Sequence, residues 1–182
     1  MDIKEILTNA GYLIVGEASN GIQAIDLCRK HKPDLILMDI NMPKLDGIKA
    51  AQLIMNEDLV DSLIMLTAYS GKEFIEKVNN VGALGYIVKP IDDAKLIPQI
   101  KIAISRGKQI RAIKNSITKI KEDFENSKTI FRAKEVLMEK FSLSENDAYK
   151  KLRKLSMDKQ CSILETSMTL IDFNKNNSSG KE

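Results

Sequence analysis

The feature that most constrains the fold is an alternation of short apolar runs and helical stretches over residues 1–90. The apolar runs have the length of β-strands, and they lie at residues 13–15, 35–38, 63–66 and 85–88. Between them, apolar residues recur at helical spacing, at residues 3–7, 20–28, 48–54 and 71–81. Strands that alternate with helices predict parallel βα units, so we expect an α/β fold with a doubly wound sheet.

From about residue 92 the alternation gives way to one long helical repeat. Residues at steps of three and four are apolar except for Arg106, in the series Ala103, Arg106, Ile110, Ile113, Ile117, Ile120, Phe124 and, one heptad later, Phe131. Isoleucine at both core positions leaves a dry seam that needs a partner, so we expect a parallel homodimeric coiled coil over residues 99–126. The predicted dimer seam consists of Ile110, Ile113, Ile117, Ile120 and Phe124. Isoleucine at both positions also favours higher oligomers, and a single amphipathic helix that packs within its own chain is the alternative.

Residues 127–173 are predicted to form a small all-α domain of three helices. Ser144 is the expected N-cap of the second of these helices, with Asp147 three residues later in the position of a capping box. Residues 174–182 are polar and rich in Asn, Ser and Gly, which predicts a disordered tail.

Charge divides the chain at a similar place. Residues 1–95 contain 10 Lys and Arg against 14 Asp and Glu, a net charge of −4, whereas residues 96–182 contain 18 against 11, a net charge of +7. A basic second half indicates a partner such as nucleic acid, although charge alone does not establish one. No apolar run approaches the ~20 residues of a membrane span, and Cys28 and Cys161 lack histidine partners for zinc. We therefore expect a cytoplasmic protein with no membrane partner.

Three polar side chains follow the predicted strands at the point where each strand ends. Asp39 follows the run at 35–38, Thr67 follows the run at 63–66, and Lys89 follows the run at 85–88. Because parallel strands end at one edge of a sheet, these side chains are expected to converge. A carboxylate, a hydroxyl and an ammonium suit phosphoryl transfer to a side chain, with Asp39 as the nucleophile. Each residue taken singly is better explained as a solvated strand end, but three such residues in register favour a phosphoryl-transfer site.

The string D-I-N-M-P-K-L-D-G at residues 39–47, with the later T-A and K-P, resembles the receiver domain of two-component response regulators. The resemblance covers residues 1–98 and implies a flavodoxin-like sheet of strand order 2-1-3-4-5. It implies that Asp39 is the phosphoacceptor, that Thr67 and Lys89 contact the phosphoryl group, and that Tyr86 is the aromatic switch residue. It also implies a sensor histidine kinase as partner and Mg²⁺ bound by Asp39 and the backbone carbonyl of Asn41.

The sequence departs from the receiver pattern at its beginning. Receivers begin with a strand that ends in two adjacent acidic residues, and this chain begins directly in the first helix. The first strand is the central one, so its absence leaves a gap in the sheet between the runs at 13–15 and 35–38. Two interpretations remain open. In the first, the start of the chain is misassigned or truncated, and a start at an internal Met is the simpler account. In the second, the receiver has degenerated. In either case we expect weak or no Mg²⁺-dependent phosphorylation of this polypeptide, because the acidic pair is absent.

A second resemblance covers residues 127–173. The run from Ala133 to Lys159, A-K-E-V-L-M-E-K-F-S-L-S-E-N-D-A-Y-K-K-L-R-K-L-S-M-D-K, is similar to the ANTAR domain, an RNA-binding antitermination module. Glu135 and Ser142 stand where that family often has glycine, and residues 159–161 replace a more usual Asn-Arg pair. An aromatic beside Lys and Arg on one side of a helix offers a base-stacking platform with phosphate contacts. The predicted RNA-binding residues are Lys134, Tyr149, Lys150, Arg153 and Lys154.

Together these patterns predict a response regulator and not an enzyme. A kinase phosphorylates the receiver, the long helix forms a homodimer, and the paired output domains bind tandem RNA hairpins in leader transcripts and prevent termination. A DNA-binding response regulator and a phosphorylation-independent dimeric adaptor are the alternatives.

Overall fold

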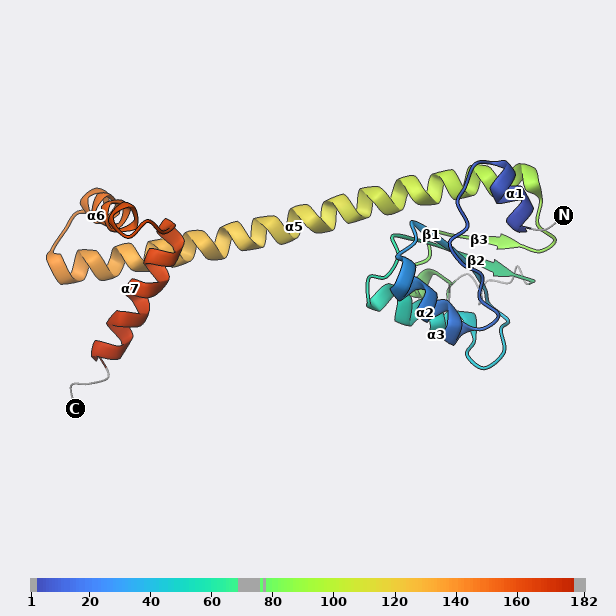
Figure 1. Cartoon of the computed structure of the whole chain (residues 1–182), viewed down its shortest axis with the longest axis horizontal. Helices are drawn as coiled ribbons and strands as arrows, with labels where there is room; N and C mark the ends of the chain where they lie inside the picture. Colours follow the sequence, from blue (N-terminus) through green and yellow to red (C-terminus); the bar gives the residue numbers. More distant parts are fainter. Residues whose placement is uncertain (1–2, 69–75, 77, 179–182) are drawn as a thin grey trace. The chain divides into compact units, whose positions relative to one another are not determined.

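The computed structural model describes residues 3–68, 76 and 78–178 (Figure 1). It divides into an N-terminal unit, Met1–Lys114, and a C-terminal unit, Asn115–Glu182. In chain order the elements are α1 (Ile3–Asn9), α2 (Gly21–His31), β1 (Leu35–Asp39), α3 (Gly47–Asn56), β2 (Ser62–Thr67), β3 (Gly85–Val88), α5 (Asp93–Phe141), α6 (Glu145–Asp158) and α7 (Ile163–Ser178). Most of the helix predicted at 71–81 lies outside the described residues.

The three strands form one parallel sheet in the order β1-β2-β3. All six residues of the central strand β2 are buried, as expected for a strand that is covered on both faces. The predicted α/β fold with a parallel sheet is thereby confirmed.

The sheet has a separate hydrophobic core on each face, and successive β2 residues alternate between them. Leu63 and Met65 pack with residues of α2 and α3, whereas Ile64 and Leu66 pack with residues of α1 and α5. In Figure 1, α2 and α3 accordingly lie on one side of the sheet, and α1 and the first turns of α5 lie on the other. This two-sided covering is the doubly wound arrangement that the sequence predicted.

The strand predicted at 13–15 is wrong. Residues 12–18 have no regular secondary structure, and Leu13 is 86% exposed. A strand forms only where a neighbour accepts and donates its backbone hydrogen bonds, and β1 pairs on one side alone within the described residues. For the same reason β1 is less buried than predicted, since only Met38 among its five residues is fully buried.

The local signals that begin and end helices are confirmed. Asn20 is the N-cap of α2 and accepts a hydrogen bond from the backbone N–H of Gln23, while Gly11 follows α1 with a φ of 85°. Among the described residues, each helix is too short or too polar to span a lipid bilayer.

Helix α5 is one continuous element of 49 residues, longer than the predicted coiled-coil segment at 99–126. Its first part packs on the sheet through Leu96, Ile100 and Ala103. Gly107 continues this contact at the N-terminal end of β2, where an added Cβ would lie 2.2 Å from Ser62 Oγ and 2.6 Å from the Asp61 carbonyl oxygen. Arg111 then donates to the Asp61 carboxylate at 2.7 Å and Lys114 donates to the Asp58 carboxylate at 2.5 Å, so the helix is held against its own domain through Lys114.

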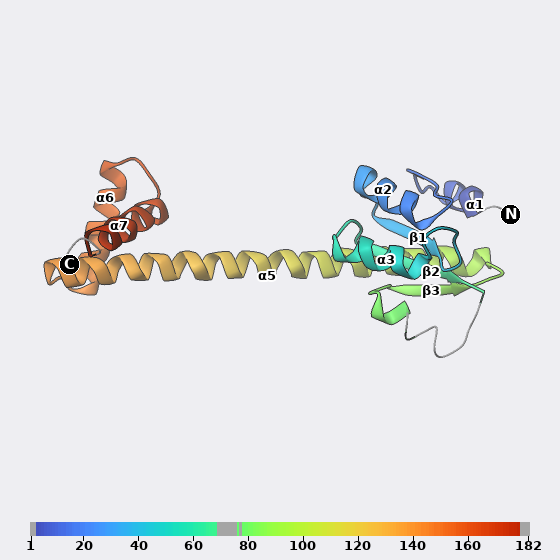
Figure 2. The same cartoon turned by 90° about the horizontal axis from the view of Figure 1, so that it is seen from below.

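The C-terminal unit consists of α5 from Asn115 onward with α6 and α7 (Figure 2). Its core contains Ala133 and Leu137 of α5 and Ala148 and Leu152 of α6, all almost fully buried. The first of the three predicted output helices is thus the end of α5 and not a separate element. Helix α7 continues through Ser178, so residues 174–178 of the predicted disordered tail are helical and the remainder lies outside the described residues.

The turn between α5 and α6 shows why glycine is frequent at one position of the ANTAR pattern, where this chain has Ser142. Ser142 has a φ of 50°, a left-handed conformation that glycine adopts without strain. Ser144 then caps α6, because its hydroxyl accepts a hydrogen bond from the backbone N–H of Asp147 and donates one to the Asp147 carboxylate at 2.7 Å. The predicted cap is confirmed, with the acidic side chain bound to the serine hydroxyl.

Candidate functional site

The carboxyl edge of the sheet brings together the residues that the sequence placed there. Asp39 pairs with Leu66 in the strand register, and Thr67 pairs with Val88. The backbone N–H of Lys89 donates to the Thr67 carbonyl at 2.8 Å, which continues the ladder by one residue. Asp39, Thr67 and Lys89 therefore occupy adjacent strand ends.

Lys89 and Asp39 form a direct ion pair, in which the Lys89 ammonium donates to Asp39 Oδ2. The other carboxylate oxygen, Oδ1, accepts a hydrogen bond from the backbone N–H of Asn41 at 3.2 Å. Both side chains remain partly exposed, whereas Thr67 is buried. The arrangement places a solvent-accessible carboxylate beside a cation that can balance added negative charge.

Gly47 is a site residue whose role the sequence reasoning missed. An added Cβ would lie 1.9 Å from the Asp39 carbonyl oxygen, and the backbone N–H of Gly47 donates to the Ile40 carbonyl at 2.9 Å. Only a glycine allows this close approach of α3 to the strand end. The signal was available, because Asp46-Gly47 precedes a helical stretch and Asp46 is the N-cap of α3.

Tyr86 lies two residues before the end of β3, and its side chain is partly exposed. It lines an open groove with Val88, Pro90 and Ile102. Tyr86 is therefore placed at the surface, in a groove that β3 and the first turns of α5 line. Its predicted role as a switch residue stays a prediction.

The described residues do not fit a Mg²⁺ site. No cluster of three His, Cys, Asp or Glu side chains occurs within 3–68, 76 and 78–178. Mg²⁺ requires near-octahedral oxygen coordination, and both oxygens of Asp39 already accept hydrogen bonds, from Lys89 and from Asn41. The backbone carbonyl of Asn41 would add only one further oxygen, which is too few for this coordination. The positive charge beside Asp39 is that of the Lys89 ammonium.

A second candidate site is the outward side of α6. Ala148, Leu152 and Ser156 are buried against the rest of the C-terminal unit, and the opposite side carries Lys150, Arg153, Lys154 and Met157, all exposed. Tyr149 is 42% exposed at the edge of this surface. We name these residues the basic α6 face: Tyr149, Lys150, Arg153, Lys154 and Met157.

Lys134 differs from the other predicted RNA contacts. Its side chain is only 16% exposed, and its ammonium forms an ion pair with Glu145 at the beginning of α6. The hydrogen bond from Lys134, followed by its charge, lowers the pKa of the Glu145 carboxyl from its usual value. In this position Lys134 connects α5 to α6, and four of the five predicted contacts lie on the basic α6 face.

The predicted dimer seam is exposed to solvent in the single chain. Ile110, Ile113, Ile117, Ile120 and Phe124 are all exposed, with Ile120 at 67%. Ala103, the first member of the repeat, is instead buried against the sheet. The apolar stripe that is free to contact a partner therefore begins at Ile110.

The parallel sheet with its aspartate, threonine and lysine, followed by a basic helical unit, defines the class of a response regulator, in which a receiver domain precedes an output domain. The chain belongs to the response regulator receiver family, whose model matches residues 1–101, and the ANTAR domain model matches residues 118–171. The predicted combination of receiver and ANTAR domain is thereby confirmed. A receiver implies a histidine kinase partner, and an ANTAR domain implies RNA binding.

The chain is 39% identical over 163 residues to the transcriptional regulatory protein PdtaR of Mycobacterium tuberculosis, an alignment that covers 90% of this chain and 79% of PdtaR. It is 38% identical over 100 residues to the chemotaxis protein CheY of Bacillus subtilis, which covers 55% of this chain and 83% of CheY. Among solved structures it resembles chemotaxis protein CheY4 of Vibrio cholerae, with 26% identity and a TM-score of 0.52 over 56% of this chain and 85% of that one. A LuxR-family response regulator from Aurantimonas has 31% identity and a TM-score of 0.52 over 56% and 73% of the two chains.

Proposed function

We propose that this protein is a transcription antiterminator that binds tandem RNA hairpins in leader transcripts under the control of its receiver domain. The observation that carries the proposal is the basic α6 face, an exposed row of cations with an aromatic ring, within the part of the chain that matches the ANTAR model. RNA loops present unstacked bases and phosphates, which such a surface contacts by stacking and by charge. The protein acts on transcripts in the cytoplasm as a regulator and not as an enzyme.

Dimerisation through the seam from Ile110 to Phe124 supports the binding of two hairpins at once. Two linked modules bind tandem sites with an effective concentration that exceeds that of free modules. The exposed isoleucine stripe supports this part of the proposal, because burying it between two copies removes its apolar surface from water.

The proposal is tested by charge reversal on the basic α6 face. Arg153→Glu with Lys154→Glu is expected to weaken binding of a two-hairpin leader RNA at least about tenfold and to reduce the salt slope by about 1.4, at roughly 0.7 for each lost contact. A gel shift over a range of KCl concentrations measures both quantities.

Lys101→Glu with Lys108→Glu is the matched control, since it changes the net charge equally on exposed positions of α5 outside the C-terminal unit. Equal losses in the two double variants would contradict a specific contact. Competition by duplex DNA as effective as competition by hairpin RNA would favour a DNA-binding regulator instead.

The receiver part of the proposal assigns phosphorylation to Asp39, with the kinase as phosphodonor in the cell. For this polypeptide we expect weak or no incorporation from acetyl phosphate with Mg²⁺, because the described residues offer no group of three metal-ligating side chains around Asp39. Intact-mass measurement of the full chain checks this, with Asp39→Asn as the control. Stoichiometric phosphorylation that disappears in Asp39→Asn would contradict the expected weak incorporation while supporting Asp39 as the acceptor.

A further inference from the structure

Three phenylalanines of the C-terminal unit lie near lysine ammonium groups, and they differ in what those lysines contact. Lys134 lies 5.3 Å from the ring centroid of Phe131, Lys140 lies 5.8 Å from that of Phe173, and Lys151 lies 3.2 Å from that of Phe141. Each ring is at least half exposed, with Phe141 at 52%. Exposed aromatic rings beside cations are the elements of a base-stacking site, so the three pairs need to be compared.

The Phe131 pair is excluded by its cation. Lys134 is mostly buried and its charge is balanced by Glu145, which leaves no free ammonium for a phosphate. Phe131 also continues the apolar repeat of α5, where a second copy of the chain is the expected partner.

The Phe173 pair is excluded by its surroundings. It has the longest of the three distances, and α7 carries two acidic residues, Glu165 and Asp172, against one basic residue, Lys175. An RNA backbone approaching Phe173 would meet the carboxylate of its neighbour Asp172.

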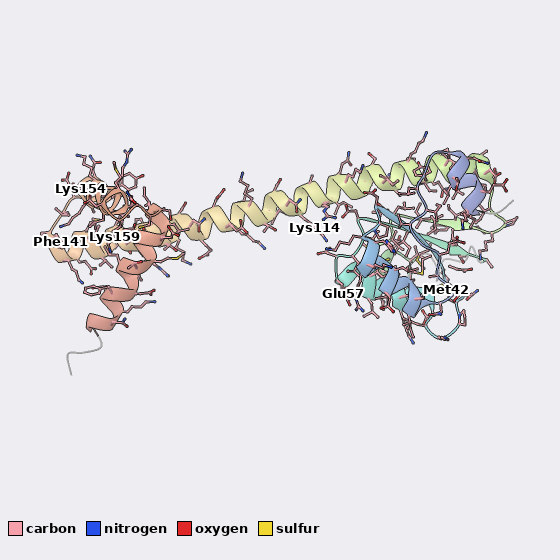
Figure 3. All side chains as sticks on the ribbon, viewed as in Figure 1. Met42, Glu57, Lys114, Phe141, Lys154 and Lys159 are labelled. Carbon is pink, nitrogen blue, oxygen red and sulfur yellow. The ribbon has the colours of Figure 1, made fainter. Side chains whose placement is uncertain are left out.

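The Phe141 pair has both a cation that no carboxylate in the described part of the chain balances and a basic surface next to it. Its ammonium comes from Lys151 of α6, which contacts the Phe141 ring and forms no ion pair with a carboxylate of the described residues. Lys150, Arg153 and Lys154 lie on the same helix, so the pair adjoins the basic α6 face on the side away from Tyr149. Figure 3 shows Phe141 and Lys154 together in the C-terminal unit.

We propose that Phe141 and Lys151 form a second nucleobase site, which stacks an unpaired base of an RNA loop on the Phe141 ring while the Lys151 ammonium binds an adjacent phosphate. This inference rests on the proposed RNA-binding function and goes beyond it, because it adds a ring to the contacts predicted from the sequence. The cations of the basic α6 face then lie between two aromatic rings, Tyr149 on one flank and Phe141 on the other.

When a base binds, the contact of the Lys151 ammonium with the Phe141 ring is replaced by contacts of both side chains with RNA, and this exchange is favourable. Lys151, itself partly buried, is held over the half-exposed Phe141 ring by a cation–π contact, which is weaker than stacking of a whole base on an aromatic side chain. The flexible stem of lysine allows the ammonium to leave the ring for a phosphate oxygen without movement of the helix. The ring face that the ammonium covers thus becomes available to the base.

The test uses the full chain and a tandem RNA hairpin selected by binding to it from a library with randomised loops. 2-Aminopurine replaces each loop adenine in turn, since its fluorescence is quenched when it stacks on an aromatic ring. Phe141→Leu is expected to lower affinity about tenfold and to remove the quenching at one loop position, with Phe141→Tyr retaining both. Lys151→Gln is expected to reduce the salt slope by about 0.7.

Phe173→Leu is the matched control, because it removes a similarly exposed ring beside a lysine and is expected to leave affinity within about twofold. Selection of no RNA by the full chain would overturn the proposed function and this site together. Binding that Arg153→Glu with Lys154→Glu abolishes, but that Phe141→Leu leaves unchanged with all quenching intact, would overturn this site alone. Circular dichroism of each variant separates loss of binding from loss of folding, and Phe141→Tyr with Lys151→Gln carries the test if Phe141→Leu does not fold.

Discussion

Two stretches of α5 carry apolar residues at similar spacing but differ in what covers them. In the first, Leu96, Ile100 and Ala103 are at most 2% exposed because the sheet packs on them. In the second, Ile113, Ile120 and Phe124 are each at least 59% exposed. Helical periodicity is common to both stretches and does not distinguish them.

The difference is explained by what lies against the helix. The first stretch meets the β2 strand and the loop before it, where Gly107 allows backbone contact and Arg111 binds Asp61. Beyond that turn the seam residues have no apolar cover within the described part of the chain, which leaves a second copy as the partner that the isoleucine pattern favours. The three predictions below test this comparison, in order of decreasing effect.

The largest effect is expected for the exposed stretch. Ile117→Asn with Ile120→Asn is expected to raise the dimer dissociation constant at least about a thousandfold, because four buried isoleucines are lost per dimer at ~1.5 kcal/mol or more each. Sedimentation equilibrium of the full chain measures this constant. Ile102→Asn, at a comparably exposed isoleucine of α5 outside the repeat, is the control and is expected to leave it unchanged. A monomeric wild-type chain, or a double variant that still dimerises, would show that the seam is not an interface.

An intermediate effect is expected for the buried stretch. Gly107→Ala is expected to destabilise the N-terminal unit by about 2 kcal/mol, because the new Cβ clashes with backbone atoms of Asp61 and with Ser62 Oγ. Urea unfolding followed by circular dichroism measures the loss. Gly85→Ala is the control, since an added Cβ there meets nothing within 4 Å. Equal stability of the two variants would mean that α5 does not approach β2 so closely.

The smallest effect is expected on the stability of the C-terminal unit when the pH is lowered. Hydrogen bonds from Ser144, together with Lys150, lower the pKa of Asp147, and the backbone N–H and hydroxyl of Ser162 lower that of Glu165. Carboxyl groups with a lowered folded-state pKa stabilise the fold above their ordinary pKa of about 4, and this stability is lost as the pH falls further. The melting temperature is therefore expected to fall by a few degrees between about pH 6 and pH 3.

Glu165→Gln is expected to reduce this pH response, with Glu139→Gln as the control because Glu139 is exposed and its carboxylate forms no ion pair with the described residues. A melting temperature that is independent of pH in this range would contradict the contribution of the caps.

The site at the sheet edge could be predicted from sequence to a large extent. Asp39, Thr67 and Lys89 each follow an apolar run, and parallel pairing alone brings such positions together. The apolar runs do not predict the ion pair of Lys89 with Asp39 or the contact of Gly47 with the Asp39 carbonyl. Both depend on the path of the loops between the strands.

Local patterns determined the elements of this protein. Helical period, the caps at Asn20 and Ser144, and the strand runs at 35–38 and 63–66 concern neighbours in the chain, and short-range sterics and hydrogen bonds are sufficient to produce them. Tertiary structure decided which elements had partners. Residues 13–15 have the composition of a strand but form none, because no neighbouring strand pairs with them within the described residues. The charge of Lys134 is balanced by an ion pair with Glu145, whereas Lys151 contacts an aromatic ring instead of a carboxylate. The physical reason is that a β-ladder, a salt bridge and a buried face each require a second surface, which local sequence does not specify.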